Sequence, residues 1–499
     1  MLHRKERSKI GSEDTMKLQK ITIKNFRSIE EQSLEIKEIG GSYTYALIGV
    51  NESGKSSFLE ATALFEGGTP DFPDDFHDET KPVEVVFHYE LETVDKDELR
   101  DDLISKGFDD KAATKASVKE VDIRIFFSPI VNTQRQKEDI PVLEKEVWPD
   151  YTLQGTAAIK KEKGVEVADF NLREYFATFL PEHFWQYSHR AVFWRSEDRY
   201  LISTQIDLDA FATQKDKLSV PLANCFQLAG ITDIPGAIQK MKTSPADSRN
   251  LQDKLSDKVT DHIKKVWPDH PIRIKFQING TQLTFLVEDD GVKYKVRTTS
   301  QRSDGFRQFI SFLLTISAQN SAAKLTNTLL LLDEPETHLH PQAQEYLKDE
   351  LIRISKGKDD NIVIYATHSN YMIDKSHIDR CFRVIKGKDC KTEIKQFEGE
   401  TSTYSEVNYE VFDIASSDYH NELYGCIENA DNSKLEALAK DQVWKNKKTG
   451  STEKVSLQKY IRHSIHHPEN GQNKDFSDAQ LRKSIETLRK IRSDLNKKP

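Results

Sequence analysis

The sequence predicts an α/β protein in which helices flank a mixed sheet, and three apolar runs carry this prediction. Residues 43–48 form a short apolar run that leads into a glycine-rich turn and then a helical pattern. Residues 329–332 are four consecutive leucines, as expected of a central parallel strand that is buried on both faces. The third run, IVIYAT, ends just before His368. Strands separated by helical segments favour a parallel sheet at the centre of the fold.

The composition is that of a soluble protein with an extensive polar surface. The 499 residues are too many for one hydrophobic core, so we expect two or three units. No apolar run approaches the roughly 20 residues that cross a bilayer. Residues 1–15 are charged and lack the apolar stretch of a signal peptide, so we expect a disordered leader and a cytoplasmic protein. The four cysteines form no CxxC pair, which argues against a cysteine-based metal site.

A phosphate-binding loop is predicted at residues 49–57. Gly49, Gly54, Lys55 and Ser56 have the spacing GxxxxGKS, between a predicted strand and a predicted helix. The glycines let successive backbone N–H groups converge on anionic oxygens, and the helix N-terminus adds partial positive charge. Lys55 supplies a cation to the β- and γ-phosphates, and the Ser56 hydroxyl is a suitable Mg²⁺ ligand. The loop therefore predicts a site for a nucleoside triphosphate.

Two adjacent carboxylates follow the four leucines. Asp333 stands at the carboxyl end of the predicted strand, where it can reach Mg²⁺ directly or through water. Glu334 is placed to orient and deprotonate an attacking water molecule. The alternative is a solvated acidic loop, which does not explain why two carboxylates and a proline directly follow buried leucines.

These motifs occur in the order found in ABC-type ATPases. The Walker A motif at 49–56 precedes a shortened signature RSDGFRQ at 302–308, the Walker B motif LLLLDEP at 329–335, a D-loop THLH at 337–340 and a switch histidine, His368. The opening LQKITIKNFRSIEEQSLEI, with Arg27 in NFRS, resembles the first strand of the SMC/RecF/OLD-like branch. The signature and DEPETHLHP resemble the AAA_15/AAA_21-type ATPases of bacterial anti-phage defence systems. The resemblance covers residues 18–92 and 272–395.

The resemblance implies an ABC-type P-loop NTPase head that binds and hydrolyses ATP at a head-to-head dimer interface. Ser303 and Gly305 of one subunit would face the γ-phosphate held by Lys55 of the other. Glu334 would be the general base and His368 the γ-phosphate sensor. Mg²⁺ would be held by Ser56 and Asp333. The residues expected to contact ATP are Gly49, Asn51, Glu52, Ser53, Gly54, Lys55, Ser56, Ser57 and Arg27.

One departure from the family concerns the Q-loop. The family places a glutamine after the Walker A helix, yet none occurs between Ser57 and Gln134. The Q-loop role therefore has no assigned residue, and slow hydrolysis would be consistent with this.

The motifs predict a chain of five parts. They are a leader at 1–15, an N-terminal ATPase part at 16–92, an α+β insertion at 93–271, a C-terminal ATPase part at 272–398, and a basic helical domain at 399–499. The insertion has no sustained heptads, which argues against the long coiled coil of SMC proteins. In the C-terminal ATPase part, apolar residues with a period of two flank Asn279-Gly280, which predicts a hairpin turning at this dipeptide. No TOPRIM nuclease pattern follows, since QFEGETS at 396–402 lacks a buried strand before it.

The C-terminal stretch is basic and contains an arginine–histidine cluster. Residues 434–499 carry 16 lysines and arginines and 8 acidic residues, a net charge of +8 (16 − 8). Arg462, His463 and His467 fit R-[N/H/D]-x3-H, which resembles the motif of HEPN ribonucleases. In such a site His467 would handle the 2′-OH proton and Arg462 would hold the phosphate. The alternatives are a contact with nucleic acid or protein, or a solvated helix face on which Arg462 pairs with His466. A metal site is the least supported reading.

Two classes of function remain open. The first is an ATPase of bacterial anti-phage defence that regulates a nuclease effector, either a partner protein or the chain's own C-terminal domain. The second is a RecF-like ATPase of DNA repair or maintenance that binds DNA, or an ATP-bound scaffold with little hydrolysis. In each case we expect a homodimer or higher oligomer formed through the ATPase heads, a nuclease or nucleic acid (RNA or DNA) as partner, and no membrane.

Overall fold

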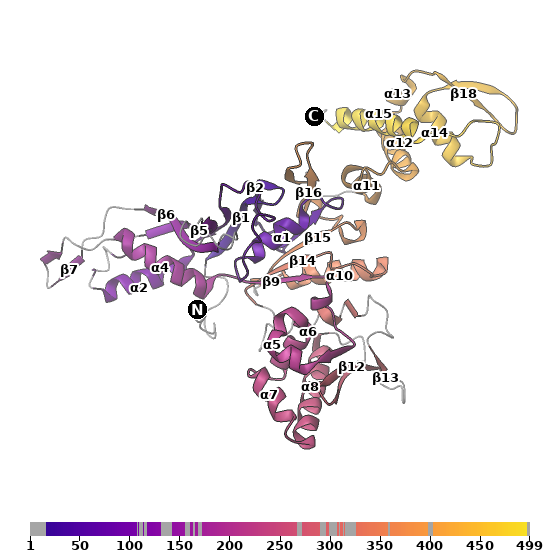
Figure 1. Cartoon of the computed structure of the whole chain (residues 1–499). Helices are drawn as coiled ribbons and strands as arrows, with labels where there is room; N and C mark the ends of the chain where they lie inside the picture. Colours follow the sequence, from indigo (N-terminus) through magenta and orange to yellow (C-terminus); the bar gives the residue numbers. More distant parts are fainter. Residues whose placement is uncertain are drawn as a thin grey trace. The chain divides into compact units, whose positions relative to one another are not determined.

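The computed structural model describes residues 16–106, 108, 113, 117–130, 142–154, 160–162, 165–167, 172–266, 272–289, 296–298, 307–308, 310–312, 314, 326–357, 360–397 and 403–496 (Figure 1). The expected leader at 1–15 lies outside these residues. The chain divides into two compact units, 1–398 and 399–499, and each is described by itself. Among the helices of the described residues, none has both the length and the apolar character needed to cross a membrane.

The first unit contains a six-stranded sheet with the order β17-β16-β3-β15-β14-β9. Five strands are parallel, and only the edge strand β17 is antiparallel to its neighbour. β3, β14 and β15 are buried along their whole length, which explains their continuous apolar sequence. The predicted mixed α/β sheet is therefore confirmed. The bounds are β3 (Thr44–Ile48), β9 (Arg190–Arg195), β14 (Thr328–Asp333), β15 (Ile362–Thr367), β16 (Cys381–Lys386) and β17 (Thr392–Gln396).

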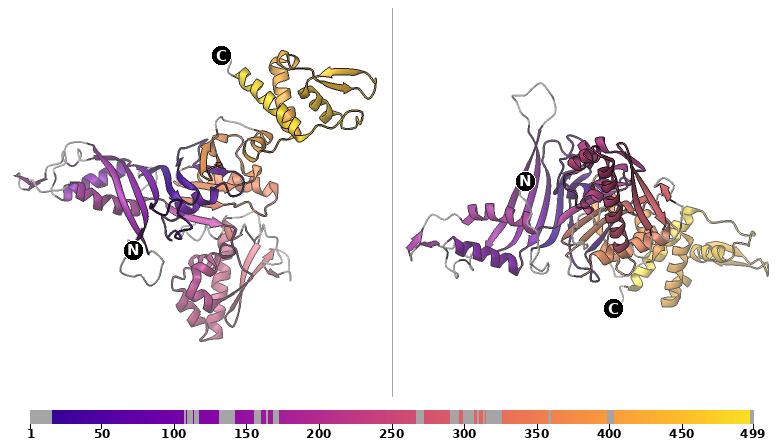
Figure 2. Two further views of the ribbon diagram at one scale, coloured as in Figure 1. Left: turned by 45° about the horizontal axis from the view of Figure 1, so that its top comes forward. Right: turned by 90° about the horizontal axis from the view of Figure 1, so that it is seen from below.

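A second, antiparallel sheet has the order β2-β1-β4-β5-β6. Helix α1 (Lys55–Ala63) contacts strands of both sheets, and its Phe58 and Leu59 belong to the core that the two sheets share. Helices α2 (Thr93–Ser105) and α4 (Leu172–Tyr187) lie beside β5 and β6 (Figures 1 and 2). The strand bounds are β1 (Lys17–Phe26), β2 (Ile29–Glu35), β4 (Val83–Glu90), β5 (Ser117–Ile130) and β6 (Val142–Gln154). A short hairpin joins β7 (Lys160–Glu162) to β8 (Val165–Val167).

A third group of elements has a hydrophobic core of its own, to which Ile310 and Leu314 also contribute. Its sheet has the order β10-β12-β11, with β13 added to β12. The predicted 272–289 hairpin is confirmed, although the two-residue loop is Gly280-Thr281, with Gly280 at φ 62°. The elements are β10 (Gln205–Asp207), α5 (Leu208–Leu218), α6 (Val220–Leu228), α7 (Ile234–Met241), α8 (Pro245–Val266), β11 (Ile272–Asn279), β12 (Gln282–Asp289) and β13 (Val296–Thr298).

The structure corrects the expected bounds of the insertion. Residues 93–271 do not form one separate subdomain, because β5 and β6 extend the antiparallel sheet and β9 is an edge strand of the central sheet. Conversely, the β11–β12 hairpin packs with α8 rather than with the central sheet. Sequence order alone could not reveal this, because pairing between distant strands fixes which sheet a strand joins.

The second unit packs its helices around a small core of its own. It also contains a two-stranded hairpin, β18–β19, which the prediction of a basic helical domain did not include. Trp444 of this hairpin packs with Val455 and Tyr460. The elements are α11 (Tyr404–Phe412), α12 (Ser417–Asp431), α13 (Ser433–Glu436), β18 (Gln442–Lys445), β19 (Thr452–Val455), α14 (Leu457–His466) and α15 (Asp478–Asn496).

Candidate active site

The carboxyl ends of four parallel strands converge at one edge of the central sheet. β3 leads into the loop that ends at Lys55, β14 ends at Asp333, and β15 ends one residue before His368. β9 ends at Arg195, which is the register partner of Asp333. Loops that follow the carboxyl ends of parallel strands are where α/β proteins bind their ligands. The topology therefore brings together motifs that lie as far apart as residues 49 and 368.

The phosphate-binding loop has the backbone that its glycines require. Gly54 is the N-cap of α1 at φ 106°, and a β-carbon there would lie 2.1 Å from Thr392 Oγ1. Lys55 Nζ donates to the carbonyl oxygens of Gly49 and Val50, both at 2.9 Å, so the ammonium lies within the loop. Burial lowers the pKa of Lys55, while the carboxylates of Asp333 and Glu334 oppose this effect.

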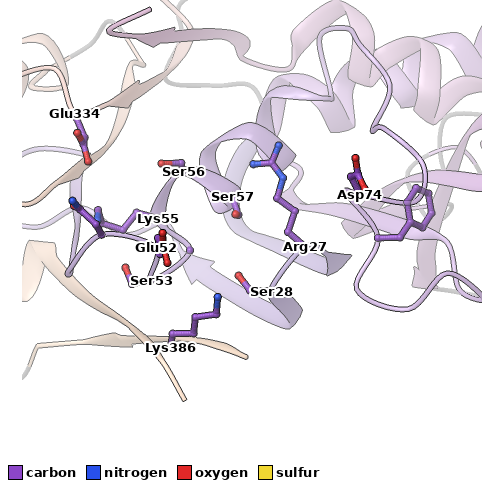
Figure 3. A pocket seen from close by; sticks show the side chains of 13 residues that line it. Arg27, Ser28, Glu52, Ser53, Lys55, Ser56, Ser57, Asp74, Glu334 and Lys386 are labelled. Atoms are coloured by element: carbon purple, nitrogen blue, oxygen red, sulfur yellow. The ribbon is translucent and has the colours of Figure 1, made fainter. Parts of the chain in front are cut away.

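A cavity of about 480 Å³ opens over this loop (Figure 3). Every residue expected to contact ATP lines it except Gly49. The prediction missed four lining residues: Ser28, Asp74, Phe76 and Lys386. Lys386 ends β16, and Figure 3 shows its side chain reaching toward the phosphate-binding loop. Ser28 lies in the quoted motif NFRS but was given no role, and no motif contains Asp74, Phe76 or Lys386.

Ser56 and Asp333, the two residues expected to hold Mg²⁺, are hydrogen-bonded to each other. Ser56 Oγ donates to Asp333 Oδ1 at 2.9 Å, across 277 residues of sequence. Asp333 is only 9% exposed, and burial raises its pKa to about 6 against the opposing hydrogen bond from Ser56. A hydroxyl and a carboxylate side by side suit Mg²⁺, whose charge would offset the cost of a buried carboxylate. The residues present therefore fit the ion.

Glu334 and His368 face each other beside this pair. His368 Nδ1 lies 3.3 Å from Glu334 Oε1. This contact lowers the pKa of Glu334 and raises the pKa of His368. Glu334 has φ 49°, a backbone conformation that costs energy in a residue with a side chain. An ionised carboxylate that lines the nucleotide cavity can accept a proton from water.

Two neighbouring contacts support the Walker B segment and were not expected. Thr367 Oγ1 donates to the carboxylate of the buried Glu336, and burial raises the pKa of Glu336 to about 7. Gln308 Nε2 donates to the carbonyl oxygen of Pro335 at 2.9 Å. Gln308 belongs to the predicted signature stretch, whose Ser303 and Gly305 lie outside the described residues.

Thr392, the first residue of β17, is hydrogen-bonded to the phosphate-binding loop. Its Oγ1 donates to the Ser53 carbonyl oxygen at 2.9 Å and lies 2.8 Å from Ser28 Oγ. Its backbone N–H donates to the Ser28 carbonyl oxygen at 2.8 Å. Thr392 therefore joins the loop to the turn after Arg27, although it is 339 residues from Ser53 in sequence.

In the second unit, the arginine–histidine cluster divides between two neighbours. Arg462 Nη2 lies 3.0 Å from Glu428 Oε2, and its guanidinium lies 4.4 Å from the centre of the Tyr424 ring. His463 and His467 lie beside Trp444 instead, with ring centres 5.2 and 6.4 Å from the indole. The expected pairing of Arg462 with His466 is replaced by the contact with Glu428 on α12. Arg462 and His467 thus have different neighbours, and an RNase role for them stays a prediction.

Comparisons with known proteins give one family match and two partial relatives. The family model described as AAA ATPase domain matches residues 16–373. A stretch of 139 residues is 30% identical to an uncharacterized protein of Methanocaldococcus jannaschii and covers 27% of this chain and 35% of that protein. A stretch of 183 residues is 26% identical to the Old nuclease of Escherichia phage P2 and covers 33% of this chain and 30% of the nuclease. The matches thus span about a third of the length of these two relatives.

Solved structures that resemble parts of the chain include an Smc head and a RecF protein. One is the Smc head bound to the C-winged helix domain of ScpA, with a TM-score of 0.40 and 14% identity over 76% of this chain and 98% of that one. Another is the recombination mediator protein RecF of the RecFOR pathway, with a TM-score of 0.36 and 12% identity over 76% of this chain and 98% of that one.

Proposed function

The chain belongs to the AAA ATPase domain family, and on that premise we propose that it is an ATP-dependent regulator of a nuclease in bacterial anti-phage defence. ATP hydrolysis is the activity of the family. The effector, the biological role and a head-to-head dimer of two ATPase heads belong to the proposal. The sequence similarity to the Old nuclease of phage P2 supports the link to nucleic acid cleavage.

The chemistry at the cavity follows from the described side chains. Lys55 and the backbone N–H groups of the phosphate-binding loop bind the triphosphate. Mg²⁺, when bound by Ser56 and Asp333, offsets charge on the phosphate oxygens. Glu334 orients the attacking water and accepts its proton, and His368 holds the Glu334 carboxylate in place through their 3.3 Å contact.

One observation carries this mechanism: Ser56 and Glu334 line the cavity, and Asp333 and His368 contact them, although the motifs are distant in sequence. In a head-to-head dimer, Ser303 and Gly305 of the second copy would close the cavity. The N-terminus of a signature helix is an anion site, which is the reason a γ-phosphate would draw the two copies together.

We assign the nuclease to a partner protein rather than to the C-terminal unit. The reason is that the guanidinium of Arg462 is already held by Glu428 and Tyr424. The C-terminal unit then serves as the contact to that partner or to nucleic acid. Acidic residues of α11 and α12 already pair with several of its basic side chains, including Arg489 with Glu410.

The test is a cleavage assay with purified chain, Mg²⁺ and ATP on transfer RNA, single-stranded RNA and duplex DNA. The chain alone should cleave none of them. Cleavage should appear when the protein encoded by the adjacent gene is added. Cleavage by the chain alone that is lost in His467→Ala would instead place the nuclease in the C-terminal unit. ATP hydrolysis without any cleavage in either mixture would contradict the proposed regulation of a nuclease.

A further inference from the structure

The fourth strand end at the active site carries an arginine that no motif assigns. β3, β14 and β15 each deliver functional residues at their carboxyl ends, and β9 delivers Arg195 to the same edge. Arg195 is paired in register with Asp333, the carboxylate expected to hold Mg²⁺. Arg195 does not line the nucleotide cavity, so any effect on the reaction has to pass through its neighbours.

The principal neighbour of Arg195 is Glu60, on helix α1 one turn after Ser56. Arg195 Nη1 donates to Glu60 Oε1 at 2.9 Å. The other oxygen of the same carboxylate, Oε2, lies 2.8 Å from Arg27 Nη2. Arg27 lines the nucleotide cavity, and its Nε donates to Asp75 Oδ1 at 2.7 Å. Glu60 thus bridges a guanidinium at the cavity and a guanidinium at the end of β9, an arrangement we call the Glu60 bridge.

The other side of Arg195 leads to Arg307, near the end of the predicted signature, and to Ser311 after it. Arg195 Nη2 lies 2.5 Å from Glu197 Oε1, in the segment that follows β9. A few residues later, the N–H of Ile202 donates to Ser311 Oγ at 2.8 Å. The carbonyl oxygen of Ile202 accepts from Arg307 Nε at 2.8 Å. These contacts, together with the chain from Glu197 to Ile202, connect the nucleotide cavity to Arg307 and Ser311.

Arg195 also has an unsatisfied donor. Its Nε is buried, and the described residues offer it no hydrogen-bond acceptor. A buried donor without a partner is costly and calls for an explanation, such as a different position in another state of the protein. The charges around Arg195 also favour a second position. Arg195 lies near the carboxylates of Glu60, Glu197 and Asp333, and binding of Mg²⁺ and a triphosphate changes the net charge around it.

We propose that Glu60 and Arg195 are positioning residues for ATP hydrolysis, which connect the cavity residue Arg27 to the segment that holds residues 307–311. When phosphate oxygens compete for Arg27, Glu60 shifts its pairing toward Arg195, and the segment after β9 moves with it. Arg307 and Ser311 are thereby held in place for catalysis only when nucleotide is bound. The inference depends on the ATPase activity and not on the proposed nuclease.

The test compares steady-state ATP hydrolysis with the equilibrium affinity for ATP in purified variants. Arg195→Met should lower kcat about tenfold or more, as expected for loss of one charge-assisted contact. The Kd for ATP should stay within about twofold, because Arg195 does not touch the cavity. Arg195→Lys, which keeps a cation for Glu60, should recover part of the lost kcat.

Arg190→Met is the matched control, because Arg190 is exposed at the opposite end of β9. It should leave kcat unchanged. The double variant Glu60→Gln with Arg195→Met should have the kcat of the slower single variant, because both changes break the same bridge. Multiplicative losses in the double variant, equal losses in Arg190→Met, or a normal kcat in Arg195→Met would each overturn the proposal. Circular dichroism and a thermal melt of each variant exclude loss of fold as the cause.

Discussion

Replacing Asp333 by asparagine should stabilise the nucleotide-free protein while abolishing ATP hydrolysis. Burial raises the pKa of Asp333 from 3.8 to about 6, so ionising this carboxyl is harder in the folded state than in the unfolded chain. At about 1.4 kcal/mol per pKa unit, the ionised carboxylate costs the folded state about 3 kcal/mol at pH 8. Asparagine carries no charge, and its Oδ1 can still accept the hydrogen bond from Ser56.

The raised pKa of Asp333 determines how the stability gain of Asp333→Asn depends on pH. A raised carboxyl pKa makes the folded state relatively more stable at low pH, and this advantage is lost as the pH rises from about 4 through 6. The gain from Asp333→Asn should therefore fall from about 3 kcal/mol at pH 8 to about half of that at pH 5. With roughly 2.1 cal/mol/K of unfolding entropy per residue over about 380 residues, the gain at pH 8 corresponds to a rise in Tm of about 4 °C.

The assay is differential scanning calorimetry in EDTA without nucleotide, at one scan rate and at both pH values. Asp349→Asn is the control, because Asp349 is an exposed carboxylate on α10 (Pro341–Ile354) and should leave Tm unchanged. A lower Tm for Asp333→Asn at pH 8, or a difference that is the same at pH 5, would refute the reasoning.

Three further predictions concern the loop and the C-terminal unit. Lys55→Ala should abolish ATP binding in isothermal titration calorimetry, and wild-type affinity in this variant would contradict the site. Thr392→Val removes the hydroxyl that donates to the Ser53 carbonyl. It should weaken ATP binding about threefold to tenfold and change kcat less. An unchanged Kd would show that the contact does not position the loop. Arg462→Met should lower the Tm of the C-terminal unit because it breaks the contact with Glu428, whereas His467→Ala should not. Equal shifts in both variants would argue against this reading.

The motifs that follow buried strands could be predicted because each is local in sequence. A run such as LLLLDEP predicts both a buried strand and the residues at its end. The P-loop spacing predicts a turn and the helix after it. Lys55, Ser56 and Glu334 all line the cavity.

Contacts between distant segments could not be predicted in this way. Arg195 and Thr392 reach the site only because β9 and β17 lie at the two edges of the central sheet, and no pattern in a single sequence announces strand order. The bounds of the insertion were wrong for the same reason. The cluster around Arg462 was interpreted from spacing on one helix, whereas its partner Glu428 comes from another helix.

The most direct test of the central claim is phosphate release by wild type and Glu334→Gln, with bound nucleotide measured in the same samples. We expect both proteins to bind Mg²⁺ and ATP with similar affinity, because Glu334 contributes little to holding the triphosphate. Only the wild type should release phosphate, with the variant slower by about a hundredfold or more, as for loss of a general base. Glu334→Gln that hydrolyses ATP at the wild-type rate would contradict the account.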